Sequence, residues 1–140
     1  MILRCNYEET QALRHGATAV LGIEGAVPCS IEPSLEGRFQ VETLLPRLTG
    51  DLSLQTLVEL RNVEVAVRTI VECLEAEMKS VVVQSHPGDE GAVDAYFEFA
   101  HSFAVLSRIS EIRGHMEAMI ELVTGHRPDE ETARTFQFPD

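Results

Sequence analysis

The chain is poor in positive charge and contains no tryptophan. Its 140 residues include 11 Lys plus Arg against 23 Asp plus Glu, which gives a formal net charge of −12. A surface of this sign repels a phosphate backbone, so nucleic acid is not expected as a partner. Six Phe, two Tyr and no Trp predict a mostly aliphatic core. The length predicts a single domain over residues 1–140.

Long apolar runs are also missing. The longest purely aliphatic cluster is the three valines at 81–83, far short of the ~20 residues that cross a bilayer, so no membrane association is expected. The amino terminus turns acidic at Glu8 before an apolar run develops, unlike a secretory signal. Cys5, Cys29 and Cys73 are an odd number at spacings that match no zinc knuckle or redox pair. We interpret them as free thiols in a reducing cytoplasm.

Motifs for nucleophilic catalysis and phosphate binding are absent. The sequence holds no Gly-x-Ser-x-Gly elbow, and its glycines lack both the Walker lysine and the strand context of a phosphate loop. Glu59 and Glu77 fall near the apolar side of a predicted helix, where a buried carboxylate pair would suit acid–base chemistry. The alternative is that they reach water or pair with arginine. No catalytic residue is predicted, and a non-enzymatic role is favoured.

What the sequence does contain is helical periodicity. Asn6 is a good N-cap for a helix over about 7–21, and Ser34 can cap a second helix that Pro46 should end or kink. No Gly or Pro occurs between Ser53 and Pro87, so the third helix is long. Its seam follows steps of three and four residues: Leu57, Leu60, Val67, Val71, Leu74, Met78 and Val81.

The predicted fold is an all-α helical bundle built on a long antiparallel hairpin. Two helices over about 53–85 and 89–124 fold back on each other at His86-Pro87-Gly88, and Gly125 ends the second one. Shorter helices precede the hairpin. A short C-terminal helix follows it, with Pro128 near its first position and Asp129 in its first turn.

The second arm of this hairpin changes its apolar face along its length. On a helical wheel the first half and the second half present apolar side chains in nearly opposite directions, with the change near Ser107. Such a helix must either bend or change partners. The first face holds Ala92, Tyr96, Phe99, Ala100, Phe103 and Leu106, and the second holds Ile109, Ile112, Met116, Met119, Ile120 and Val123.

A second subunit is the simplest partner for the extra apolar face. We therefore expect a homodimer, with Ile109, Ile112, Met116, Met119, Ile120 and Val123 at the interface. The alternative is that the N-terminal helices and the tail cover this face within one chain. The leading functional hypothesis is a non-enzymatic interaction or assembly protein whose acidic surface meets a basic protein partner.

Glu98-Phe99-Ala100-His101 places a carboxylate and an imidazole on one helix face, as a transition-metal site requires. The motif resembles the ligand motif of ferritin-like di-iron proteins, which implies a metal-binding oligomer using Glu98 and His101. Those bundles carry the motif on two helices, and here it occurs once. A second copy would come from another subunit, as the resemblance to encapsulated ferritins implies. Glu64 or Glu77 would add carboxylates. The alternative is a solvated polar face.

Ala100-His101-Ser102 also resembles the phospho-accepting helix of histidine phosphotransfer domains, which are four-helix bundles with one exposed histidine. This resemblance implies a phosphotransfer module. The sequence departs from that family's pattern, because Ala104 and Val105 stand where a Lys and a Gly usually follow.

Overall fold

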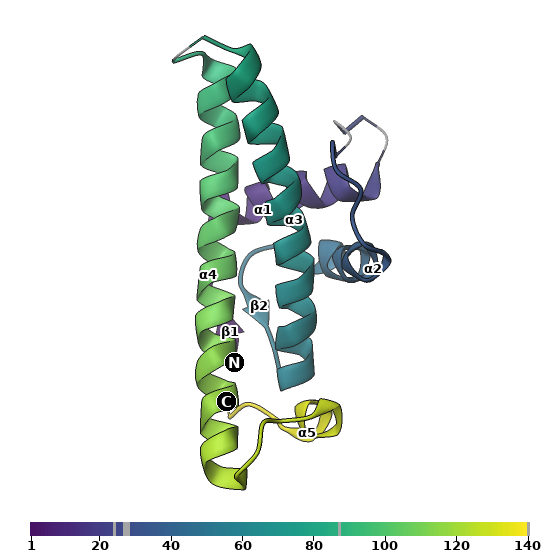
Figure 1. Ribbon diagram of the computed structural model, residues 1–140, viewed down its shortest axis with the longest axis vertical. Coiled ribbons are helices and arrows are strands. Elements are labelled where there is room, and N and C mark those ends of the chain that lie inside the picture. The colour runs from purple at the N-terminus through teal and green to yellow at the C-terminus, as the bar shows by residue number, and fades with distance from the viewer. Residues whose placement is uncertain (24, 27–28, 87, 140) are drawn as a thin grey trace.

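Two long antiparallel helices dominate the computed structural model, which describes residues 1–23, 25–26, 29–86 and 88–139. Helices α3 (Leu57–Gln84) and α4 (Glu90–Thr124) lie side by side, α1 (Tyr7–Leu21) crosses the hairpin, and α2 (Leu35–Leu44) packs on α3 (Figure 1). Helix α5 (Glu130–Thr135) lies at the base. The prediction of an all-α bundle built on a long hairpin is confirmed.

The helix starts follow the local capping chemistry. The Asn6 side chain accepts a hydrogen bond from the Glu9 backbone N–H, and the Glu9 carboxylate accepts one from the Asn6 N–H, which closes a capping box. Ser34 caps α2 in the predicted way. Pro46 stands in a 3₁₀ turn over Leu45–Arg47, so the chain leaves the α-helical form there as expected.

The third helix begins at Leu57 and not near Ser53. Leu52–Ser53 forms strand β2, which pairs antiparallel with β1 (Ile2–Leu3). Leu52 is buried and Ser53 is exposed, so this short alternation serves a strand better than a helix. Thr56 is the N-cap, since its Oγ1 accepts from the backbone N–H of Glu59. Pro87, in the predicted turn, lies outside the described residues.

The C-terminal segment docks on the start of α3. Asp129 is the N-cap of α5, so Pro128 precedes the helix instead of occupying its first position. The Phe138 backbone N–H donates to the carbonyl of Gln55 at 2.7 Å, and the Phe138 side chain is buried. The half-buried Phe136 packs against the same core. Both phenylalanines thus hold the C-terminal tail on the core.

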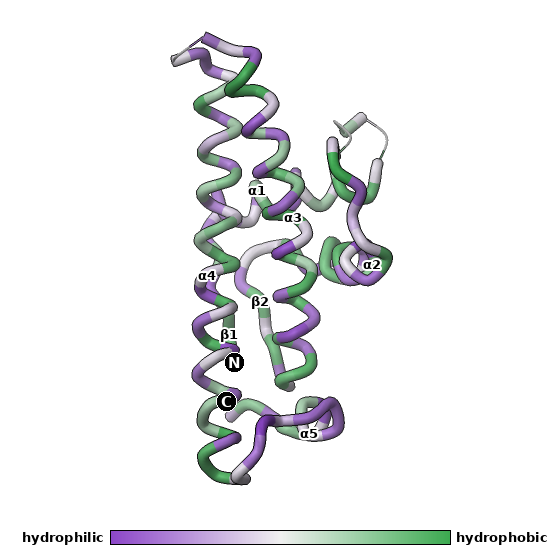
Figure 2. The backbone as a smooth tube through the Cα atoms, viewed as in Figure 1, coloured by the Kyte–Doolittle hydropathy of each residue, from purple (hydrophilic) through white to green (hydrophobic). Residues whose placement is uncertain are grey.

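The core lies in the lower part of the hairpin, where α1, α2 and α4 pack on α3 and buried leucines of the β1–β2 pair join them (Figures 1 and 2). It is mainly aliphatic, as the composition predicts. The largest fully buried side chains are Leu3, Leu13, Val41, Leu44, Leu48, Leu52, Leu54, Leu57, Leu60, Ile70, Leu74 and Ile109.

Gly16 allows α1 to approach α3 closely. A Cβ at this position would overlap Ile70 Cγ2 and lie 3.2 Å from Leu74 Cγ.

We expect Gly16→Ala to lower the free energy of unfolding by about 1–3 kcal/mol, because the overlap exceeds the gain in helix propensity. Gly114→Ala is the matched control, since a Cβ there meets nothing within 4 Å. It should raise stability by roughly 0.5–1 kcal/mol. Urea unfolding followed by circular dichroism measures both, and shifts in the same direction would contradict this account of the crossing.

Candidate functional site

Glu98, one of the two predicted metal ligands, lies in a group formed by three helices. His15 Nδ1 of α1 is 2.8 Å from each of the two carboxylate oxygens of Glu98 on α4. Glu77 of α3 completes the group, and one ligand atom from each residue lies within 4.8 Å of the others. All three side chains are half-buried. The close approach of α1 to α3 at Gly16 brings the neighbouring His15 next to Glu77 of α3 and Glu98 of α4.

His101, the other predicted ligand, is not part of this group. Its ring stacks on Phe97 with the ring centroids 6.3 Å apart. It also lies near Glu9, whose carboxyl pKa is held below its ordinary value chiefly by hydrogen bonds from Arg108, with a smaller contribution from His101. The two members of the Glu-x-x-His motif therefore have different neighbours. Of the two carboxylates considered as additional ligands, Glu77 joins Glu98 and Glu64 does not.

The other buried carboxylates are held by arginines. Glu64 of α3 accepts from Arg113 Nε at 2.7 and 2.9 Å and from Arg68 at 3.2 Å. Arg113 also reaches Glu117, which accepts from Arg61. A chain of charge-assisted hydrogen bonds thus links α3 to the second half of α4. Since a buried charge is tolerated only when paired, these groups are structural and not reactive.

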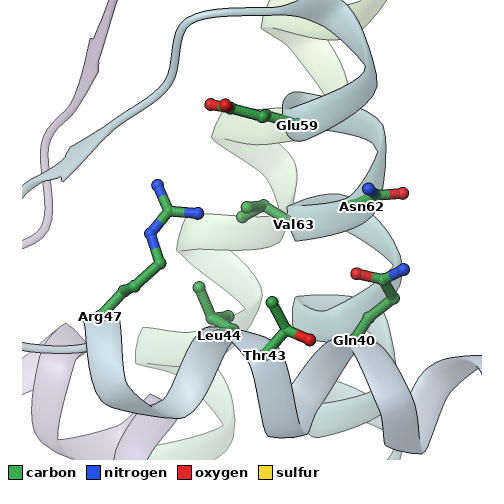
Figure 3. A pocket seen from close by; sticks show the side chains of 7 residues that line it. All are labelled: Gln40, Thr43, Leu44, Arg47, Glu59, Asn62 and Val63. Carbon is green, nitrogen blue, oxygen red and sulfur yellow. The ribbon is translucent and has the colours of Figure 1, made fainter. Parts of the chain in front are cut away.

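The carboxylates first considered for acid–base chemistry do not form a pair. Positions 59 and 77 are 18 residues apart on α3, about 27 Å along the helix axis. Glu59 accepts a hydrogen bond from the backbone N–H of Gln55. It also borders a small cavity between α2 and α3 that Arg47 faces from the other side (Figure 3). Arg47 donates to the carbonyl of Ser53, so both charged groups of this cavity already have partners.

The cysteines are thiols in structural positions. Cys5 and Cys73 are buried and Cys29 is half-buried. Burial raises the pKa of Cys5 to about 11, and burial together with the hydrogen bond that the Cys73 thiol donates to Cys29 raises the pKa of Cys73. A thiol with a raised pKa is a poor nucleophile at neutral pH.

The predicted interface residues fall into three classes. Ile109 and Ile120 are buried by their own chain. Ile112 and Met116 are half-buried and pack against the core. Met119 and Val123 are exposed, and with Leu122 they form an apolar surface near the end of α4, with side chains 62% to 86% accessible.

Helix α4 is continuous through the predicted change of face. It runs without interruption from Glu90 to Thr124, and its buried residues are Ala95, Ser102, Val105, Ile109 and Ile120. These positions follow heptad-like spacing along one side. The first-half apolar face is therefore not the buried one. Tyr96 and Phe103 remain about half exposed, while Ser102 is fully buried. Within the first-half face, Phe99 and Leu106 are partly buried against the core, whereas Tyr96 and Phe103 stay on the surface.

The fold and its sites define an all-α protein with a protruding helical hairpin. No known family model, curated protein or solved structure matches the chain. Within the described residues, no helix has the length and apolarity needed to cross a membrane.

The ion pair between Glu9 and Arg108 should set part of the acid sensitivity of the fold. Arg108 Nη2 is 2.6 Å from Glu9 Oε2 and links the second half of α4 to the start of α1. Because the folded-state pKa of Glu9 lies below its ordinary value of 4.5, the pair stabilises the fold fully above that pH and progressively less as the pH falls below it.

We expect Arg108→Met to cost about 2 kcal/mol at pH 7, less than the roughly 3–5 kcal/mol of a fully buried pair because 38% of the Arg108 side chain is exposed. The stability difference from the wild type should narrow below about pH 4.5, which urea unfolding across pH measures. Arg134→Met is the control, because Arg134 and Glu130 form an exposed pair. A difference that does not change with pH would contradict the role given to Glu9.

Proposed function

We propose that the protein is a non-enzymatic helical assembly protein that forms a homodimer through the outer part of its hairpin. We call this part the arm and define it as residues 75–86 and 88–101. The observation that supports the proposal is that, among the described residues of the arm, Ala95 is the one buried side chain. Helix α1 contacts the base of the arm, where His15 meets Glu98, and beyond that crossing the arm consists of α3 and α4 alone (Figure 1).

Among the exposed side chains of the arm, five are large and apolar. We call these five residues the arm surface, and they are 41% to 85% accessible: Val82, Val83, Val93, Tyr96 and Phe97. Val82, Val93, Tyr96 and Phe97 line one shallow hollow, so these residues are neighbours and not isolated exposures. The rings of Tyr96 and Phe97 meet edge to face. Clustered aromatic and aliphatic side chains of this kind are typical of protein–protein interfaces.

A second copy of the chain would cover the apolar side chains that the arm leaves exposed. Two hairpins packed side by side about a two-fold axis form a four-helix bundle, in which each pair of helices covers the apolar side chains of the other. The contact is self-complementary and closes after two subunits, so it does not propagate into a longer assembly.

Charge supports a further partner of opposite sign. The Glu9–Arg108 and Glu64–Arg113 pairs each sum to zero, so the formal net charge of −12 is carried by the remaining side chains. A basic protein would be attracted to such a dimer. The apolar surface of Met119, Leu122 and Val123 at the other end of α4 is available for it. The free thiols agree with the expected cytoplasmic setting.

The test is the subunit number of the wild type and of two charge variants. We expect a dimer for the wild type in light scattering coupled to size-exclusion chromatography. Tyr96→Glu should shift it to a monomer, because a dimer would bury two unpaired carboxylates. Val123→Glu places the same charge at an exposed position at the other end of α4 and should leave the dimer intact.

Two other outcomes would contradict either the homodimer or the interface assigned to it. A monomeric wild type over the micromolar range would overturn the homodimer. A dimer that Val123→Glu dissociates and Tyr96→Glu does not would move the interface to the originally predicted residues Met119 and Val123. Circular dichroism of both variants establishes that the helices are retained.

A further inference from the structure

We propose that His15, Glu77 and Glu98 bind one divalent transition-metal ion, in the class of Zn²⁺, Fe²⁺ and Mn²⁺. The donors are one imidazole nitrogen and the oxygens of two carboxylates, contributed by α1, α3 and α4. Mixed nitrogen and oxygen donors suit these borderline cations better than Mg²⁺ or Ca²⁺, which prefer oxygen alone. The ligand set keeps Glu98 from the sequence motif and replaces His101 with His15.

The spacing of the donor atoms fits a single ion. Nitrogen and oxygen ligands lie about 2.0–2.2 Å from such an ion, so two ligands of the same ion are separated by at most about 4.4 Å. The donor atoms of the three residues lie within 4.8 Å of one another. Small side-chain rotations therefore bring all three into the first coordination shell without moving the backbone.

The charges around the site call for a cation. Glu9, Glu64 and Glu117 each have an arginine partner. In the described part of the chain, Glu77 has no ion pair with Lys or Arg, and His15 is the single basic partner of Glu98. Two half-buried carboxylates this close repel each other when both are ionised. A divalent ion would neutralise them, which one imidazole cannot do alone.

The scaffold holds the ligands on regular elements. Each residue lies inside a helix, and the crossing of α1 over α3 is fixed by the contact of Gly16 with Ile70 and Leu74. The side chains of His15 and Glu98 are each 34% accessible, so an ion and its bound water can enter from solvent. Three protein ligands leave coordination positions open for water.

The position of the site would let the ion cross-link three helices. On α3, Glu77 comes shortly after Leu74, the last buried residue of that helix. On α4, Glu98 lies between the buried residues Ala95 and Ser102. The ion would join α1 to both helices where the arm leaves the core. This inference does not rest on the proposed dimer, because all three ligands come from one chain.

The test uses the full-length protein, stripped with chelator and titrated with Zn²⁺ by calorimetry and with Co²⁺ by visible absorption. We expect one ion per chain. His15→Gln, Glu77→Gln and Glu98→Gln should each weaken binding at least about a hundredfold, because loss of a direct ligand should cost no less than the 10–100-fold of an outer-shell partner. His101→Gln and His115→Gln are the controls. His115 stands beside Glu111 in an exposed pair on the same helix, 3.9 Å apart.

The opposite results would overturn the site. Binding below one ion per chain, or binding that survives His15→Gln but is lost in His101→Gln, removes the assignment. A thiolate-to-cobalt charge-transfer band would instead place the ion at cysteine and also overturn it. Circular dichroism and subunit number are recorded for each variant. The monomeric Tyr96→Glu protein should still bind one ion per chain, so failure of the metal site and failure of the dimer are distinguished.

Discussion

The structure depends on the burial of helix α3. From Leu57 to Leu74 this helix is enclosed by α4 on one side and by α1 and α2 on the others, and α5 closes its start. Apolar burial of this kind is the main favourable term in folding. No residue of α3 beyond Leu74 is buried. The boundary of the core is therefore set by where the neighbours of α3 end and not by where its own helical sequence ends.

The composition of α4 follows from this arrangement. Its contact with α3 uses small, polar and charged side chains as well as apolar ones. Ser102 is fully buried and satisfies its hydroxyl by donating to the carbonyl of Phe99, while Arg113 reaches across to Glu64. Because polar and charged side chains occupy part of the contact with α3, several large apolar residues of α4 lie on the surface instead. The opposed apolar faces in the sequence of α4 are the result, and the helix has no interruption at the change.

The sequence predicts most of the local structure because local structure has local causes. The caps at Asn6 and Ser34 and the terminator Gly125 depend on residues within one turn, and each was placed correctly. The strand at Leu52–Ser53 could not be recognised, because it exists only through pairing with Ile2–Leu3. The group around Glu98 was missed in part for the same reason. His15 is 83 positions away along the chain, and its one local signal is the small residue Gly16 beside it.

The arm also divides the molecule into regions of unequal local stability. Backbone amides in the lower hairpin are protected by the cooperative core, whereas those of the arm, residues 75–86 and 88–101, belong to a segment in which Ala95 is the one buried side chain. Segments with few buried apolar contacts open at a lower free energy than the whole domain. The arm is thus a two-helix unit able to fray while the rest of the chain stays folded, and a second subunit bound over it would raise the free energy of that local opening.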